Sequence, residues 1–175
     1  MTKPIWQWSA VDTAAAIRKG DITAQEAVDA AINRMMEANE AVNAVTVDLS
    51  DSAKRAARRA DGVVQSGVAL GPLHGVPITI KENVDQAGQA TTNGVPAFAD
   101  MVAAEDSPVV ANRRKAGAII IGRTNTPEFS LRWFTDNPLR GLTKNPWDEG
   151  ITPGGSSGGA AAAAALGIGH IAHGN

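Results

Sequence analysis

The sequence predicts an α/β protein with a parallel sheet, and three segments in the middle of the chain carry this prediction. Residues 76–80 (VPITI) and 118–122 (AIIIG) are short β-branched runs bounded by glycine or proline, as buried strands are. Between them, SPVVANRRKAG (107–117) has the features of a helix start, with Ser107 as cap and Pro108 in the first turn. A strand, a helix and a strand in this order favour parallel strands joined by a crossover helix.

The first 70 residues are expected to form a helical region ahead of this α/β part. Thr23 and Glu26 have the spacing of a capping box and precede AQEAVDAAINRMMEA, where small or apolar residues recur at every fourth position. A second helix is expected from Ser50, placed as its cap, to Gly67. Its four cations are interpreted as a solvated helix face rather than an anion site: Lys54, Arg55, Arg58 and Arg59.

The overall composition excludes several classes of protein. Hydrophobic residues make up 43% of the 175 residues and the net charge is −2, so nothing electrostatic favours direct binding of nucleic acid. The absence of cysteine excludes a disulfide framework, a thiol nucleophile and thiolate metal sites, and it fits a cytoplasmic protein, which we expect. The start of the chain has no apolar signal segment, and no run approaches the ~20 residues of a membrane helix. No membrane partner is therefore expected.

The three histidines raise the question of a metal site. His170 and His173 are three positions apart, but their stretch is apolar and broken by glycines, without a neighbouring carboxylate. His74 lies far from both in the sequence. This spacing does not favour metal ligation, and we expect neither a metal ion nor another cofactor.

A lysine at the end of the first predicted strand is the first candidate for catalysis. Lys81 follows an almost wholly apolar run, and Glu82 and Asn83 come directly after it. A lysine that is desolvated at the carboxyl end of a strand has a lowered pKa and can act as a neutral base. Ligands of open α/β sheets also gather at this end. The segment 124–153 has no clear period, and so long an irregular stretch in a compact domain is usually functional.

Two serines in a glycine-rich loop are the second candidate. Ser156 and Ser157 lie within GGSSGG, directly before AAAAAALG. The glycines permit a close approach of the backbone, and the alanines predict a thin helix that packs tightly. That helix would direct its free N–H groups and positive end toward the serines, which favours an anion or an oxyanion. A phosphate cradle is the alternative, but the GK[ST] ending of a nucleotide-binding loop is absent.

These segments together resemble the amidase signature family. GPLHGVPITIKENVD resembles the lysine segment of that family, and GRTNTPEFS, NPLRGLTKNPWD and TPGGSSGGAAAAAALG resemble its signature region in the same order. Lys81 and Ser156 are 156 − 81 = 75 positions apart, which agrees with the family's layout. The resemblance implies the amidase signature fold, an α/β fold with a mixed, mostly parallel sheet flanked by helices. Residues 71–175 would form the N-terminal part of its core.

The resemblance also implies a catalytic triad of serine, cis-serine and lysine, which hydrolyses a carboxylic amide through an acyl-enzyme. Lys81 would be the neutral base. Ser156 would be the bridging serine, reached through a cis peptide bond, and would pass a proton from the nucleophile to the lysine. Four further residues are assigned to substrate binding: Ser130, Gly154, Gly155 and Ser157.

The family's nucleophilic serine lies in a DxGGS-type motif, which should follow GHIAHGN, where this sequence ends. We therefore expect the chain to be the N-terminal part of a longer amidase, inactive by itself, with the remainder of the amidase chain as its partner. The family layout disfavours a dyad in which Ser156 or Ser157 is itself the nucleophile.

Two other functions remain open at this point. The chain could belong to the glutaminase subunit of a tRNA-dependent amidotransferase, which releases ammonia and works with partner subunits. It could also be a binding module without catalysis. For the leading hypothesis we expect a small amide as substrate, and the sequence leaves a homodimer open.

Overall fold

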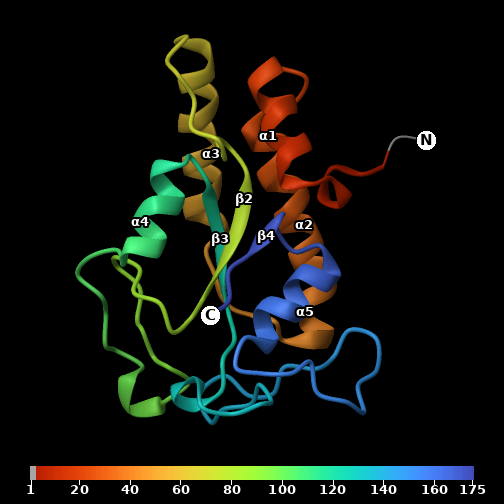
Figure 1. Cartoon of the computed structure of the whole chain (residues 1–175), viewed down its shortest axis with the longest axis vertical. Coiled ribbons are helices and arrows are strands. Elements are labelled where there is room, and N and C mark those ends of the chain that lie inside the picture. The colour runs from red at the N-terminus through yellow and green to blue at the C-terminus, as the bar shows by residue number, and fades with distance from the viewer. Residues whose placement is uncertain (1–2) are drawn as a thin grey trace.

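The computed structural model describes residues 3–175 and shows a four-stranded sheet with helices on both faces (Figure 1). The strand order is β1-β3-β2-β4. Strand β2 (Pro77–Lys81) runs parallel to β3 (Ile119–Thr124) and to β4 (Ile171–Ala172), whereas β1 (Val45–Asp48) runs antiparallel to β3. The prediction of a mixed, mostly parallel α/β sheet is confirmed.

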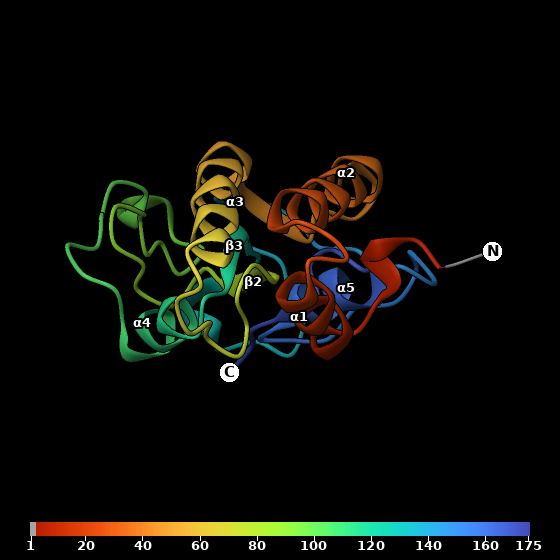
Figure 2. The ribbon, with the colours of Figure 1, turned by 90° about the horizontal axis from the view of Figure 1, so that it is seen from above.

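The helices form two layers around the sheet. Seen from above, α2 and α3 lie on one side of the strands, and α1 and α4 on the other (Figure 2). In the described part of the chain, the α-helices are α1 (Ala10–Lys19), α2 (Ala24–Val42), α3 (Ser50–Gln65), α4 (Pro108–Lys115) and α5 (Gly158–Leu166), and the 3-10 helices are η1 (Ile5–Gln7), η2 (Pro96–Phe98) and η3 (Glu128–Ser130). Within residues 3–175, no helix is long and apolar enough to cross a bilayer.

The core has two parts because successive side chains of a strand point to opposite faces. Ile119 and Ile121 of β3 pack with α2, α3 and α5. Ile120, with Ile78 and Ile80 of β2, packs with α1 and α4 on the other face. The continuous β-branched runs that predicted these strands are therefore explained by burial on both faces.

The predicted starts of α2 and α4 are confirmed. Thr23 Oγ1 accepts a hydrogen bond from the Glu26 backbone N–H, and the Glu26 carboxylate accepts one from the Thr23 N–H, which completes the capping box. Ser107 Oγ accepts from the Val110 N–H, and Pro108 occupies the first turn of α4. The four cations assigned to a solvated face of α3 are all exposed.

The N-terminal region also contains a strand, β1, that sequence reasoning missed. Its four residues follow α2 directly, where Asn43 ends the helix in a left-handed conformation. The assignment of Ser50 as cap of α3 was wrong, because α3 begins at Ser50 and Leu49 is the N-cap residue. The capping acceptor comes from Asp48, whose Oδ1 lies 2.8 Å from the backbone nitrogen of Ser50.

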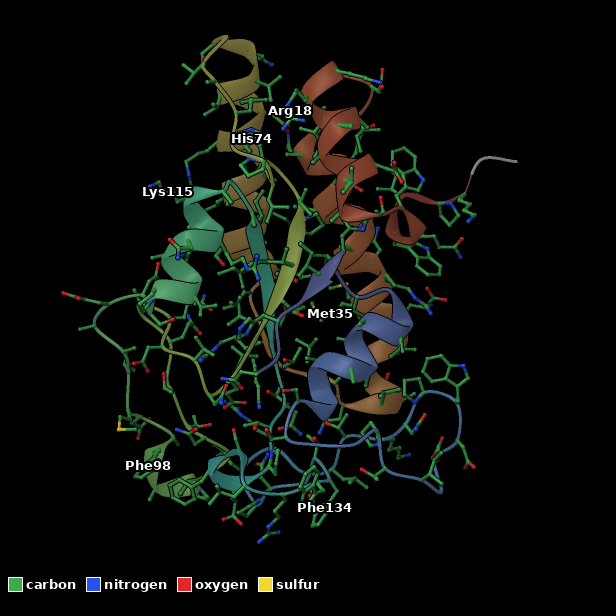
Figure 3. All side chains as sticks on the ribbon, viewed as in Figure 1. Arg18, Met35, His74, Phe98, Lys115 and Phe134 are labelled. Atoms are coloured by element: carbon green, nitrogen blue, oxygen red, sulfur yellow. The ribbon has the colours of Figure 1, made fainter. Side chains whose placement is uncertain are left out.

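The carboxyl ends of β2 and β3 lead into long loops at one end of the sheet. Phe98 and Phe134 mark these loops, and His74 and Arg18 lie at the opposite end (Figure 3). Strand β2 ends at Lys81, and β3 extends to Thr124, two residues beyond the predicted strand. The candidate residues follow these strand ends.

Candidate functional site

Lys81 is the last residue of β2, and its side chain is fully buried. Its Nζ lies 2.8 Å from Ser156 Oγ and 3.0 Å from Asn175 Oδ1. Burial lowers the pKa of the Lys81 amine to about 8, because an environment of low dielectric constant disfavours the charged ammonium. The structure thus brings together the lysine and the serine that the sequence singled out, in a setting where the lysine can lose its proton near neutral pH.

Ser156 lies in a loop that is fixed by the close approach of another segment. The peptide bond between Gly155 and Ser156 is cis, and Gly154 has a φ of 87°. A Cβ atom on Gly155 would come within 2.5 Å of the Arg132 carbonyl oxygen and 2.7 Å of the Phe134 nitrogen. Glycine is required at position 155 because the two backbones touch there.

Two threonines hold the serine loop in place. Thr135 Oγ1 donates to the Gly154 carbonyl at 3.0 Å and accepts from the Gly158 N–H at 3.1 Å, so it links the residues on both sides of Ser156. Thr126 Oγ1 donates to the Ser156 carbonyl at 3.3 Å. Sequence reasoning did not single out either threonine, because threonine in an irregular loop carries no distinctive signal.

Ser130 lies beside this loop, in an unusual backbone conformation. Ser130 and its neighbour Phe129 have φ values of 58° and 51°, in the left-handed region that L-residues rarely adopt. The Ser130 hydroxyl is 2.8 Å from Thr126 Oγ1 and accepts from Asn83 Nδ2 at 3.0 Å. Strained backbone of this kind persists where surrounding contacts hold it, and it gathers at functional sites.

Ser157 forms hydrogen bonds with the backbone of Asn175. Its Oγ accepts from the Asn175 N–H at 3.1 Å and donates to the Asn175 carbonyl at 2.9 Å. The Asn175 side chain is thereby directed toward Lys81 and Asn83. Asn83 and Asn175 are site residues that sequence reasoning did not identify as functional, although Asn83 stands two positions after Lys81.

A second buried polar cluster flanks the lysine. The Glu82 carboxylate, fully buried, accepts from Thr46 Oγ1 at 2.8 Å, from Thr92 Oγ1, and from Arg140 Nε at 3.1 Å. Arg123 of β3 is also fully buried and donates to backbone carbonyls of the segment after Lys81, including that of Glu82 at 2.8 Å. These contacts fix the direction in which the chain leaves β2.

The helix after the serines completes the geometry. Helix α5 begins at Gly158, so its first N–H groups lie next to Ser156 and Ser157. A helix N-terminus carries partial positive charge and free donors. Chemically, the arrangement offers a buried amine that can accept a proton, a hydroxyl within hydrogen-bond distance of it, and a nearby region that favours negative charge.

Two of the three histidines bond to groups outside the site, whereas His173, which follows β4, is near enough for burial and the charges of Arg113 and Lys81 to lower the pKa of its imidazole. His170 bonds to the Trp8 carbonyl and to Thr13 Oγ1, and His74 Nε2 lies 3.0 Å from the Ala60 carbonyl. Within residues 3–175, no group of three His, Cys, Asp or Glu side chains is arranged to hold a metal ion.

The chain matches the family model for the amidases over residues 26–175. It is 64% identical over 172 residues to an indoleacetamide hydrolase of Bradyrhizobium diazoefficiens, an alignment that covers 98% of this chain and 33% of the relative. It is 40% identical over 150 residues to a glutamyl-tRNA(Gln) amidotransferase subunit of Acidothermus cellulolyticus, which covers 86% of this chain and 30% of the relative.

A solved structure of a bacterial aryl acylamidase superimposes with a TM-score of 0.91 at 30% identity, and the match covers 95% of this chain and 35% of that one. That acylamidase is one of the amidase signature enzymes. The chain therefore belongs to the amidase signature family, and it spans about a third of the length of the relatives that it matches.

Proposed function

We propose that the protein that carries this chain hydrolyses carboxylic amides, with Lys81 as base and Ser156 as the serine that bridges it to the nucleophile. The observation that carries this proposal is the hydrogen bond of 2.8 Å between Lys81 Nζ and Ser156 Oγ, formed by a buried lysine whose pKa is lowered to about 8. A neutral amine can accept the proton of a serine hydroxyl, whereas an ammonium cannot.

In the proposed reaction a second serine, supplied by a segment other than residues 1–175, attacks the amide carbonyl carbon. Its proton passes to Ser156 Oγ while the Ser156 proton passes to Lys81 Nζ. The carbon–nitrogen bond then breaks, and the proton returns through Ser156 to the leaving nitrogen. Water attacks the resulting ester by the same proton path and releases the acid. By this mechanism residues 1–175 alone do not hydrolyse the amide.

The substrate site is proposed to lie where the serine loop meets Ser130. The Ser130 hydroxyl and the backbone of Gly154, Gly155 and Ser157 would contact the substrate around the reacting carbonyl. The partial positive charge at the start of α5 favours negative charge beside it. No metal or organic cofactor enters this reaction.

The similarity to relatives supports one class of substrate. An identity of 64% over nearly the whole chain to an indoleacetamide hydrolase favours a primary amide of an arylacetic acid, such as indoleacetamide. The amidotransferase relative shares 40% over a shorter stretch. This difference favours hydrolysis of a free small amide over transamidation of a charged tRNA.

Ammonia release from indoleacetamide tests the proposal. The complete protein should lose roughly 10²–10⁴-fold in kcat when Lys81→Met removes the base or Ser156→Ala removes the bridging hydroxyl. The double variant should be hardly worse than either single one, because the two groups act as a unit. Lys115→Met, at an exposed lysine of α4, is the matched control and should retain full activity. Variants at positions 81 and 156 that keep wild-type kcat would refute the assignment.

A further inference from the structure

A closed circuit of hydrogen bonds connects the candidate base to the rest of the site. Lys81 Nζ and Asn83 Nδ2 both lie within bonding distance of one oxygen, Asn175 Oδ1, at 3.0 and 3.1 Å. Asn83 Nδ2 also donates to Ser130 Oγ at 3.0 Å. From Ser130 the circuit continues to Thr126 Oγ1, which donates to the backbone carbonyl of Ser156, and it closes through the Ser156 side chain, whose Oγ faces Lys81 Nζ. Neither Asn83 nor Asn175 has a role in the proton path described above.

The donors and acceptors in this circuit determine one another. The NH₂ group of Asn83 can only donate, so the atom of Asn175 that faces it must be the carboxamide oxygen. This oxygen can only accept, so Lys81 must direct an N–H toward it. The lone pair of the neutral Lys81 amine is then free to face Ser156 Oγ. If the Asn175 carboxamide were turned over, its own N–H would occupy the lone pair of Lys81.

Contacts with neighbouring groups restrain two residues of this hydrogen-bond circuit, Asn175 and Ser130. Asn175 cannot shift as a whole, because Ser157 Oγ bonds to both its backbone N–H and its carbonyl. The backbone at Ser130 is held by hydrogen bonds from the Ser130 N–H to the Pro127 carbonyl and from the Phe129 N–H to the Asn93 carbonyl, both at 2.9 Å. Rotation of the Asn175 carboxamide about its side-chain bonds is therefore the main motion that could change the hydrogen bonds of Lys81. The hydrogen bond from Asn83 to Asn175 Oδ1 opposes this rotation.

We propose that Asn83 is a positioning residue for the Lys81 base: by donating to Asn175 Oδ1, it holds the Asn175 carboxamide in the orientation that leaves the lone pair of Lys81 for Ser156. The inference rests on the proposed function for its catalytic consequence. The orientation itself is a property of residues 3–175 and can be measured without turnover.

The charged groups around Lys81 are the same in every variant of the first test below. Glu82 adjoins Lys81 and is paired with Arg140. His173, which follows β4, lies within the electrostatic influence of the Lys81 charge. Arg123 approaches from β3. Helix α5, packed against β2, contributes no ionisable side chain. A change in the Lys81 pKa on substitution of Asn83 therefore reports the local hydrogen bonds.

The first test measures the pKa of Lys81 in the complete protein, where Asn175 O, 3.4 Å from Nζ, is a neutral peptide carbonyl, from the ¹³Cε shift of labelled lysine, with Lys81→Met to assign the signal. Asn83→Leu should lower this pKa further, by roughly one unit, because the freed Asn175 N–H then bonds to the neutral amine. Asn112→Ala, at an exposed asparagine of α4, is the matched control and should leave the pKa unchanged. An unchanged pKa in Asn83→Leu would overturn the proposal. If that variant does not fold, Asn83→Ala replaces it with the same expectation.

The second test is a cycle of variants in the complete protein, with kcat taken on its alkaline plateau. Asn83→Leu should reduce kcat about tenfold, with little change in KM. In an Asn175→Asp background both side-chain oxygens of residue 175 accept hydrogen bonds, so no rotation of that side chain can turn a donor toward Lys81. Asn83→Leu in this background should therefore reduce kcat at most about twofold. An equal loss in both backgrounds would show a merely structural role for Asn83. Absence of amidase activity in the wild type would instead refute the proposed function, and the pKa test would still decide the orientation.

Discussion

Removal of Arg140 should destabilise the protein far more than removal of an ordinary surface arginine. Arg140 Nε lies 3.1 Å from Glu82 Oε1, and the Glu82 side chain is 0% exposed while that of Arg140 is 28% exposed. Arg140→Met keeps most of the side-chain length and leaves the buried carboxylate without its direct ion pair, with the hydroxyls of Thr46 and Thr92 and the more distant charge of Arg123. A buried charge that loses its partner is among the few mechanisms with a large effect on stability.

The expected size of this effect follows from the geometry. At an effective dielectric constant of about 20, unit charges 3.1 Å apart attract each other by about 5 kcal/mol. Removal of one partner of a buried pair costs about 3–5 kcal/mol. Because Arg140 is partly exposed, water can reach the vacated side of Glu82, and we expect the lower end, about 3 kcal/mol. Arg132→Met, which breaks an exposed pair with Glu128, should cost about 1 kcal/mol or less.

Urea unfolding of the wild type and the two variants measures both losses. Adding Glu82→Gln to Arg140→Met should recover part of the stability, because a neutral amide replaces the unpaired charge. Equal losses for Arg140→Met and Arg132→Met, or no recovery in the double variant, would refute the argument that Glu82 is a desolvated carboxylate neutralised by Arg140.

Three further predictions concern the same site. Gly155→Ala should cost about 2 kcal/mol or more in unfolding free energy, because the added Cβ would lie 2.5 Å from the Arg132 carbonyl oxygen. Gly62→Ala, in open space on α3, should be neutral or stabilising, and equal effects of the two substitutions in urea unfolding would contradict the prediction. Asn125→Ala should lower the free energy of unfolding by about 3 kcal/mol, because four hydrogen bonds of the buried Asn125 side chain are lost. Thermal unfolding measures this loss, and a value under about 1 kcal/mol would contradict the prediction. The unfolded chain binds more protons than the folded one between the lowered Lys81 pKa, about 8, and about 10.4, so stability should rise with pH across this window and the rise should be absent in Lys81→Met.

The elements that the sequence predicted well are those with local signals. The β-branched runs of β2 and β3, the capping box of α2 and the Ser-Pro start of α4 each specify an element within a few residues. Strand β1 was missed because its four residues lie directly between two helices, where a short VTV run carries little signal. Its pairing with β3 depends on a contact about 75 residues away in the chain, which no local pattern encodes.

In the candidate site, too, local patterns predicted some features, whereas others depend on contacts between distant parts of the chain. The position of Lys81 at a strand end and of the serines before a helix follows from local patterns. Their meeting depends on the order β3-β2-β4, which places the segment after β4 and the start of α5 beside Lys81. The supporting residues, such as Thr135 and Asn83, could not be identified from the sequence, because asparagine and threonine in loops are equally typical of turns.

The pH dependence of kcat/KM for amide hydrolysis by the complete protein tests the central claim most directly. The claim requires Lys81 to be neutral in the free enzyme, so kcat/KM should rise tenfold per pH unit on the acid side and level off above an apparent pKa of about 8. In Lys81→Met this rise should vanish along with most of the activity. A profile that is flat from about pH 6 to 9, or whose rise persists in Lys81→Met, would contradict the assignment of Lys81 as the base.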